Sequence, residues 1–228
     1  MPKTENRKPQ TPITPDSLLL QGGAQLGLAL IPAQVRQFHT YLAELKRWNA
    51  RVNLTALRTD RDIIIKHFMD SLAVLPYLGE PRSLADLGSG AGFPGLALKL
   101  LRPQMSLTLV ESRGKKAAFL EYLAAVLKLA EVTVAPVRLT LALARNWGPR
   151  FDAVVSRAAL PLGRFLELAA PVLHPGGLAL ALKGPQREDM ALAELSDLAA
   201  GLGLRLLPEV TYFLPFSGEA RRLVLARA

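Results

Sequence analysis

The chain has 228 residues and a formal net charge of +9, because 28 Lys and Arg outnumber 19 Asp and Glu. This length suits one domain with an extension, and the basic excess suits a phosphate-bearing partner. No run of about 18 residues is free of charges and helix breakers, so no membrane span is predicted. The absence of Cys fits a reducing compartment and excludes disulfides, thiolate metal sites and a Cys nucleophile, and three scattered His predict no metal cluster.

The N-terminal third of the chain is expected to be a tail followed by helices. Residues 1–16 are polar and Pro-rich and lack the apolar core of a signal peptide, so they predict a disordered tail. The segment Thr14-Pro15-Asp16-Ser17 is also typical of a helix start. Residues 17–80 show no alternating strand pattern, and we predict that they form a helical extension.

Two helices of this extension can be placed. Apolar residues recur at three- and four-residue spacing from Pro32 to Asn53, which predicts an amphipathic helix. Asp60 or Asp62 is expected to cap another helix that runs to Leu78, before Gly79.

Residues 81–228 show strands alternating with helices. Strands are predicted at residues 83–87, 106–111, 132–137, 151–156 and 177–182, with two closing strands near 204–214 and 221–227. Helices are predicted between them: one begins near Pro94, and the others lie near residues 115–129, 139–146, 162–173 and 188–201. This alternation predicts an α/β, Rossmann-like domain: a doubly wound, mostly parallel seven-stranded sheet with an antiparallel closing hairpin.

A glycine-rich loop follows the first predicted strand. Asp86 and Leu87 precede Gly88, Gly90 and Gly92, and glycines let the backbone turn tightly and approach a ligand closely. An acidic residue before Gly-x-Gly-x-Gly resembles the first strand and loop of class I methyltransferases that use S-adenosylmethionine. The position of Asp86 favours this interpretation, since it would suit the ammonium of a methionine moiety.

Two other interpretations of this loop stay open. Residues 90–95 match the dinucleotide fingerprint G-x-G-x-x-G, which places a pyrophosphate on a helix N-terminus. That match begins two residues after the strand ends, and the carboxylate of Asp86 gains nothing from a pyrophosphate. A glycine-rich turn without a ligand is the third interpretation.

The carboxyl ends of the other predicted strands supply further candidate ligand contacts, because ligands of such sheets bind there. Glu111 ends the second strand, where a carboxylate can accept both ribose hydroxyls. Leu139 and Thr140 follow the third strand, where an adenine would lie. Arg157 follows the fourth strand, next to a transferred methyl group.

The fourth strand also limits the methyl acceptor. Its end reads Ser156-Arg157-Ala158-Ala159-Leu160 and lacks the Asn/Asp-Pro-Pro-aromatic pattern that grips an exocyclic amino group. Methylation of C5 of a pyrimidine needs a Cys nucleophile, which the chain lacks. Guanine N7 carries a lone pair and no proton, so it needs close placement and no general base. The sequence is therefore compatible with an N7 acceptor.

Several segments together resemble one family. They are Val52-Asn53-Leu54-Thr55, His67-Phe68-Met69-Asp70-Ser71-Leu72, Asp86 to Gly95, Ser156-Arg157-Ala158, Leu182-Lys183-Gly184 and Gly218-Glu219-Ala220-Arg221-Arg222-Leu223-Val224. From about residue 35 to the end, the chain is similar to the bacterial 16S ribosomal RNA guanine-N7 methyltransferases, also called glucose-inhibited division protein B.

The resemblance implies a monomeric, cytoplasmic enzyme that uses S-adenosylmethionine and no metal. Its expected substrate is N7 of a guanine in 16S ribosomal RNA, free or in the small ribosomal subunit. No catalytic residue is assigned, and Arg157 is expected to position the reactants. The expected cofactor-binding residues are Asp86, Gly88, Gly90, Gly92, Phe93, Glu111, Ser112, Arg113, Leu139, Thr140 and Arg157.

The chain departs from the family at Thr140, where an acid is usual, and at Arg222, where a His is common. His67, Lys183, Arg221 and Arg222 are candidate RNA contacts, with solvated surface charge as the alternative for the cations. His67, Asp70 and Ser71 share one helical face, and a packing network is an equal alternative for them. An NAD-dependent oxidoreductase and a non-catalytic RNA-binding module remain as alternative functions.

Overall fold

A computed structural model describes residues 14–157, 159–185 and 190–228 of the chain. Helix α1 (Pro15–Gln25) begins after Thr14, whose side-chain oxygen accepts the Ser17 N–H at 3.2 Å as an N-cap. The predicted helix start is therefore correct. The predicted tail ends two residues too late, because Pro15 and Asp16 are helical, and its residues 1–13 lie outside the described residues.

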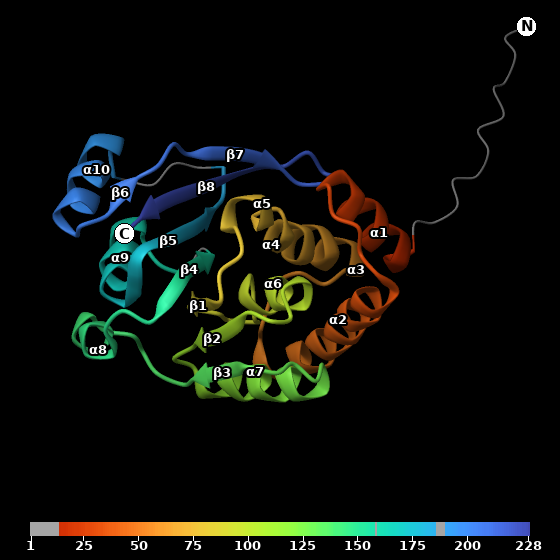
Figure 1. Cartoon of the computed structure of the whole chain (residues 1–228). Coiled ribbons are helices and arrows are strands. Elements are labelled where there is room, and N and C mark those ends of the chain that lie inside the picture. The colour runs from red at the N-terminus through yellow and green to blue at the C-terminus, as the bar shows by residue number, and fades with distance from the viewer. Residues whose placement is uncertain (1–13, 158, 186–189) are drawn as a thin grey trace, which may run out of the picture.

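A single sheet forms the centre of the molecule, with strand order β3-β2-β1-β4-β5-β8-β6 and with β7 paired to β8 (Figure 1). Its strands are β1 (Ser83–Leu87), β2 (Ser106–Val110), β3 (Val132–Ala135), β4 (Phe151–Arg157), β5 (Leu173–Lys183), β6 (Arg205–Leu206), β7 (Val210–Phe213) and β8 (Ala220–Arg227). Strands β1 to β5 are parallel, and β8 is antiparallel to β5. The predicted doubly wound, mostly parallel architecture is confirmed.

The strand predicted near residues 204–214 is divided into two short segments. Both β6 and β7 pair with β8 on the edge that faces away from β5, so eight segments occupy seven positions. Leu206 lies opposite Ala226, whereas Val210 lies opposite Leu223, so one extra residue is inserted between them. Pro208 lies in this insertion, where its missing N–H does not interrupt a ladder.

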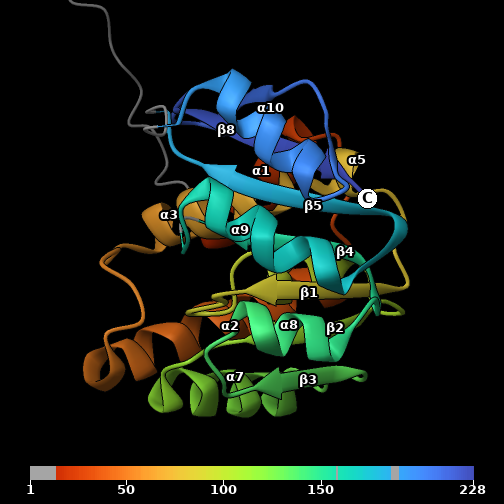
Figure 2. The same cartoon turned by 90° about the vertical axis from the view of Figure 1, so that its left-hand side faces the viewer.

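Helices cover both faces of the sheet. Helices α6 (Gly95–Leu101) and α7 (Gly114–Val126) pack on one face, together with the N-terminal extension. Helices α8 (Leu141–Trp147), α9 (Leu162–Ala169) and α10 (Leu192–Gly201) cover the other face (Figure 2). Alternate residues of β5 belong to the two cores: Leu178 and Leu180 face the first, Ala179 and Ala181 the second.

The N-terminal extension is helical, as predicted, but its second half is not one regular helix. Helix α2 (Pro32–Val52) matches the predicted amphipathic helix. The segment after it consists of α3 (Asp60–Ile63), the π-helix η1 (Ile64–Met69), α4 (Asp70–Leu72) and α5 (Leu75–Leu78). Its N-cap is Thr59, whose hydroxyl accepts the Asp62 N–H at 3.0 Å, and neither Asp60 nor Asp62 fills that role.

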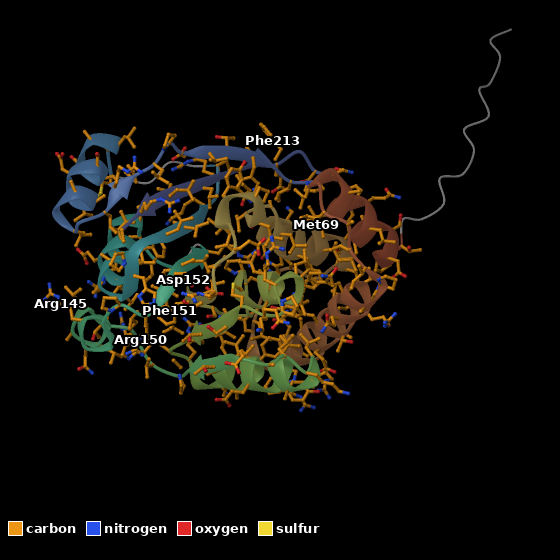
Figure 3. All side chains as sticks on the ribbon, viewed as in Figure 1. Met69, Arg145, Arg150, Phe151, Asp152 and Phe213 are labelled. Carbon is orange, nitrogen blue, oxygen red and sulfur yellow. The ribbon has the colours of Figure 1, made fainter. Side chains whose placement is uncertain are left out.

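Packing explains why the extension stays against the sheet. Met69 is fully buried between α1 and the sheet domain, whereas Phe213 on the edge strand β7 is 64% exposed (Figure 3). One hydrophobic core cluster includes residues from α1, α2 and η1 as well as from β1 and α6. Among the described residues, no helix has the length and hydropathy that a membrane span requires.

Candidate functional site

A cavity of about 780 Å³ lies at the carboxyl ends of β1, β2 and β4. Eight of the eleven predicted cofactor residues line it: Gly88, Gly90, Glu111, Ser112, Arg113, Leu139, Thr140 and Arg157. Three further cations also line it, although they were not predicted: Lys116, Arg138 and Arg164. A signal existed for Arg138, which directly precedes Leu139 in the loop after β3. We name this space the first cavity.

The glycine-rich loop bends tightly at its glycines. Gly88 and Gly90 have positive φ of 77° and 58°, which L side chains rarely adopt. A Cβ on Gly88 would come within 2.5 Å of the Ala159 Cβ, so a side chain there would collide with the loop after β4. A Cβ on Gly90 would meet just one atom within 4 Å, the Gly88 carbonyl oxygen at 3.8 Å. A side chain on Gly90 would therefore enter the open space above the loop.

Glu111 holds this loop against the end of β2. Its Oε2 accepts the Gly90 N–H at 2.9 Å and its Oε1 accepts the Arg113 N–H at 2.7 Å. A carboxylate offers about four lone-pair positions, so two remain for a ligand. Glu111, which was predicted to contact a ribose, thus also holds the glycine-rich loop in its conformation.

Asp86 does not lie where a cofactor-binding residue was predicted. Its side chain is fully buried beneath the loop and does not line the first cavity. Its Oδ2 accepts the Gly95 N–H at 2.8 Å, and its Oδ1 has no hydrogen-bond partner among the described residues. Burial raises the pKa of Asp86 to about 7, although the Gly95 N–H and Arg157 oppose this shift. Asp86 therefore anchors the start of α6 and does not present its carboxylate in the cavity.

Gly92 and Phe93 also lie outside the lining of the first cavity, contrary to the prediction. A Cβ on Gly92 would lie 2.5 Å from the Tyr41 hydroxyl oxygen and 2.6 Å from Leu96 Cδ1, so this glycine allows close packing against the extension. Phe93 is buried, and its ring stacks on the rings of Tyr41 and His67 at centroid distances of 5.0 and 4.5 Å. Both residues join the loop to the helical extension.

Thr140 caps helix α8. Its hydroxyl accepts the Leu143 N–H at 3.2 Å while the residue lines the first cavity. Thr is a preferred N-cap residue, so Thr140 stabilises the start of this helix.

A second cavity of about 680 Å³ lies on the other side of Arg157. Among the described residues, Arg157 alone lines both cavities. The second cavity is lined by residues of the extension, of the ends of β4 and β5 and of β8: Thr55, Ala56, Leu57, Lys66, His67, Asp70, Arg157, Leu182, Lys183, Gly184, Pro185, Glu219, Ala220 and Arg221.

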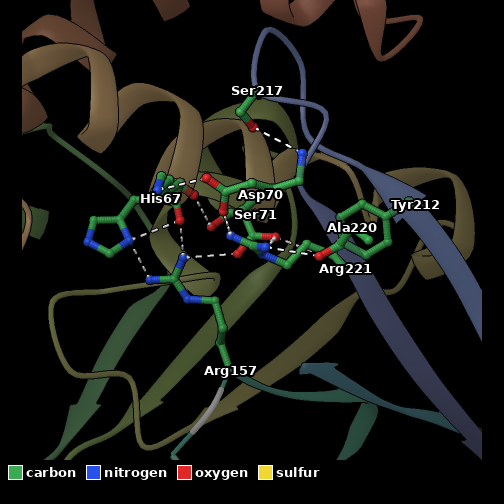
Figure 4. Close-up of polar contacts among 10 residues, drawn as sticks. His67, Asp70, Ser71, Arg157, Tyr212, Ser217, Ala220 and Arg221 are labelled. Atoms are coloured by element: carbon green, nitrogen blue, oxygen red, sulfur yellow. Dashed lines mark hydrogen bonds and ion pairs between the residues drawn. The ribbon is translucent and has the colours of Figure 1, made fainter. Parts of the chain in front are cut away.

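Arg157 is fixed by the extension. Its Nη1 donates to the Lys66 carbonyl at 3.0 Å and lies 3.4 Å from Asp70 Oδ2, while its Nη2 donates to His67 Nδ1 at 2.9 Å (Figure 4). The guanidinium also lies over the Phe93 ring, 5.0 Å from its centroid. The side chain is therefore held in one position between the two cavities.

His67 is held as a neutral ring. Burial and the nearby Arg157 lower its pKa to about 3. Its Nδ1 accepts from Arg157, so its Nε2 carries the proton and donates to Thr55 Oγ1 at 2.7 Å. Ser71 donates to the His67 carbonyl at 2.6 Å, so these residues form the packing network that was one of two predicted roles.

Asp70 joins three elements beneath the second cavity. Its Oδ1 accepts from the Tyr212 hydroxyl at 2.8 Å and lies 3.7 Å from Arg221 Nε, and its Oδ2 faces Arg157 (Figure 4). Burial raises the pKa of Tyr212, and the Asp70 carboxylate adds to this shift, so the phenol stays a donor. No sequence pattern indicated Tyr212, which comes from the distant strand β7.

The four predicted RNA contacts separate into two groups. His67, Lys183 and Arg221 line the second cavity, and Lys183 donates to the Leu160 carbonyl at 2.8 Å. Arg222 points to the opposite face of β8, because successive residues of a strand alternate. It forms two hydrogen bonds with Glu209, at 2.9 and 3.0 Å, and does not line either cavity. The structure thus removes Arg222 from the candidate site.

Metal binding has no visible support in the described part of the chain. No group of three or more His, Asp or Glu is arranged there to hold an ion.

Comparisons with known proteins agree with this arrangement. The family model described as rRNA small subunit methyltransferase G matches residues 34–203. The ribosomal RNA small subunit methyltransferase G of Roseiflexus sp. (strain RS-1) is 44% identical over 210 residues, which cover 91% of this chain and 89% of that protein. The protein of the same name from Geobacter metallireducens is 37% identical over 208 residues, covering 91% and 94%.

A solved structure shares the fold. The O-methyltransferase TomG from Streptomyces achromogenes, determined in complex with S-adenosylmethionine, has a TM-score of 0.56 at 14% identity. The match covers 82% of this chain and 89% of TomG. At this identity the likeness shows the class I methyltransferase fold alone.

Proposed function

The chain belongs to the rRNA small subunit methyltransferase G family, and from this premise we propose that it methylates N7 of a guanine in 16S ribosomal RNA with S-adenosylmethionine. The observation that carries the proposal is the pair of cavities that meet at Arg157. One cavity has the features of a cofactor site, and the other has room and charge for a nucleotide. Both are lined by one chain, so we propose a monomeric enzyme, acting in the cytoplasm where small ribosomal subunits are.

The residues of the first cavity fit S-adenosylmethionine. The open space above Gly90 leaves room for the methionine part against bare backbone. The free lone pairs of Glu111 suit the ribose hydroxyls, and Leu139 with the Thr140 backbone would flank the adenine. When bound, the cofactor supplies an electrophilic methyl group on a sulfonium.

The second cavity would receive the guanine. Lys66, Arg157, Lys183 and Arg221 line it, against the carboxylates of Asp70 and Glu219, so positive charge prevails and suits a nucleotide phosphate. Guanine N7 has a free lone pair, so the protein's task is to place it in line with the methyl group and to exclude water. The fixed side chain of Arg157 would set the boundary between the two reactants. No general base is required at this site.

The conformation of the glycine-rich loop argues against the alternative that it binds the pyrophosphate of a dinucleotide. A pyrophosphate would need free N–H groups at the start of α6. Pro94 has none, and the Gly95 N–H is already donated to Asp86. An NAD-dependent oxidoreductase is therefore not favoured.

Transfer of a labelled methyl group tests the proposal and also excludes a non-catalytic RNA-binding module. The protein is incubated with S-adenosylmethionine labelled in its methyl group and with small-subunit ribosomal RNA or assembled small subunits that were never methylated by this enzyme. We expect label in the 16S RNA with either or both substrates. Tight RNA binding without any transferred label would contradict the enzymatic function.

A further inference from the structure

Two carboxylates line the second cavity, and they differ in how much of each is available. Asp70 is buried, and both of its oxygens face partners from the protein, namely Tyr212 and Arg221 at Oδ1 and Arg157 at Oδ2. Glu219 is 39% exposed at the side chain and stands at the wall of the cavity. Glu219 is thus the carboxylate that a ligand in this cavity can reach.

Glu219 is held in place from two sides. Lys66 of the extension approaches its Oε1 at 2.7 Å, and Arg221 of strand β8 approaches its Oε2 at 3.0 Å. These cations lower the pKa of Glu219, so it stays ionised and can act as an acceptor. About four lone-pair positions exist on a carboxylate, and the two cations use two of them. Each of the two oxygens therefore keeps one acceptor position for a ligand.

Glu219 and Arg157 both line the second cavity, and each contacts a different end of Lys66. The carbonyl oxygen of Lys66 accepts from Arg157 at 3.0 Å, while its ammonium contacts Glu219 at the other end of the side chain. A flat base between these two residues would have one edge toward Arg157 and the first cavity. Its opposite edge would face Glu219.

Guanine carries matching groups on opposite edges. Its N7 and O6 are acceptors, and its N1–H and N2–H₂ are adjacent donors on the Watson–Crick edge. We propose that Glu219 recognises the target guanine by accepting hydrogen bonds from N1–H and N2–H₂, while N7 faces Arg157 and the cofactor. Adenine would present the lone pair of its N1 to the carboxylate and would be rejected. This assignment rests on the proposed function, since it concerns the acceptor of the same reaction.

Replacing the target guanosine with inosine tests the assignment. Inosine keeps N1–H, O6 and N7 but lacks the N2 amino group. For the wild-type protein saturated with cofactor, we expect single-turnover methylation of the inosine substrate to be about tenfold slower or more, because inosine loses one of the two hydrogen bonds to the charged carboxylate. Glu219→Gln presents an amide NH₂ to one of the guanine donors. It should slow methylation of guanine about as much as inosine does, and it should remove the preference for guanine.

The ratio of the two rates separates recognition from a structural role. Glu209→Gln is the matched control, because it makes the same change beside the neighbouring Arg222 on the opposite face of β8. This control should keep the preference for guanine. Equal slowing of both substrates in Glu219→Gln would overturn the assignment, because Glu219 would then merely bridge Lys66 and Arg221. Equal rates for guanine and inosine in the wild type would overturn it too.

The outcome also distinguishes the two proposals. If the wild type methylates guanine N7 and Glu219→Gln keeps the full preference for guanine, the proposed role of Glu219 is wrong while the proposed function stands. If the wild type does not methylate the guanine substrate, the proposed function fails and the assignment fails with it. Cofactor affinity, measured by titration of both variants with S-adenosylmethionine, should be unchanged, since Glu219 and Glu209 do not line the first cavity.

Discussion

At the scale of single residues, Arg157 has the most connections in the candidate site. It lines both cavities, bonds to the backbone and side chains of η1 and lies over Phe93. N7 methylation moves positive charge from the sulfonium to the guanine. A guanidinium cannot attract that charge, so Arg157 must act by holding a polar group or by keeping the two reactants aligned.

Replacing Arg157 should therefore lower turnover. We expect Arg157→Ala to lower the single-turnover rate by about tenfold or more, in line with the 1–3 kcal/mol of one good bidentate contact. Arg157→Lys should restore part of the rate, because an ammonium lacks the planar fork that contacts Lys66 and His67 together. Wild-type rates in Arg157→Ala would show that the side chain has no role in the reaction. Loss of cofactor affinity alone would assign the side chain to the cofactor.

Gly90 and Gly92 look equivalent in the sequence, but the structure predicts different effects for the same substitution. Both glycines have a positive φ, so valine strains the backbone in either variant. In Gly90→Val the new side chain meets no other side chain and would fill the open space in the first cavity, so cofactor affinity should be lost while the protein still folds with a circular dichroism spectrum near wild type. In Gly92→Val the new Cβ would collide with Tyr41 and Leu96, so the protein itself should be destabilised. Thermal unfolding and cofactor titration of both variants check this. Equal loss of stability in the two variants would contradict it.

At the scale of elements, the helical extension and the glycine-rich loop form one packed unit. Tyr41 of α2 is fully buried, and its hydroxyl donates to the Ala91 carbonyl in the loop at 2.7 Å. Its ring also stacks on Phe93. On the other side of Phe93, His67 of η1 bonds to Arg157. The extension thus contacts the cofactor loop and the boundary of the second cavity at once.

Tyr41→Phe tests this connection by removing a single hydroxyl. The Ala91 carbonyl would lose its donor in a buried position, so we expect the free energy of unfolding to fall by about 1–3 kcal/mol. Cofactor affinity should also fall, because the loop is less firmly held. Tyr122→Phe removes a hydroxyl that contacts Arg47 at the surface and should change the stability by less than about 0.5 kcal/mol. Equal stabilities of the two variants in denaturant would show that the Tyr41 hydroxyl does not hold the loop.

Sequence periodicity could predict α2 but not the form of the segment after Thr59. The recurrence of apolar residues in α2 follows from its one buried face. The π-helix η1 has no local signal, because its register depends on contacts of His67 and Asp70 with strands β4 and β7. The same limit applies to the site. Glycines and strand ends indicated the first cavity, whereas Asp86, Gly92 and Phe93 were misassigned because their packing depends on α6 and the extension.

At the scale of the whole molecule, buried ionisable groups make stability depend on pH in two directions. Asp86 has a pKa of about 7 in the folded protein and 3.8 in the unfolded chain. Its neutral form therefore contributes fully to the free energy of unfolding below pH 3.8, and this contribution is lost as the pH rises through 7. His67 has a folded pKa of about 3 against 6.5, so its contribution is full above pH 6.5 and is lost as the pH falls toward 3. The two effects oppose each other between these limits.

Asp86→Asn separates them, because Asn does not ionise and His67 is the same in both proteins. The stability of Asp86→Asn relative to wild type should increase from pH 4 to pH 8, because ionisation of Asp86 destabilises only the wild type, by a few kcal/mol at about 1.4 kcal/mol per pKa unit. Any constant effect of the amide cancels in this comparison. Denaturant unfolding of both proteins at pH 4, 6 and 8 measures it. The same difference at all three pH values would contradict the raised pKa of Asp86.

We propose that this molecule transfers a methyl group to N7 of a guanine in 16S ribosomal RNA. Mass spectrometry identifies the methylated nucleoside after reaction with isotopically labelled S-adenosylmethionine and unmethylated small-subunit RNA or subunits. We expect labelled 7-methylguanosine, and none when S-adenosylmethionine is omitted. Label in a 2′-O-methylribose or in a methylated exocyclic amine, with no labelled 7-methylguanosine, would contradict it.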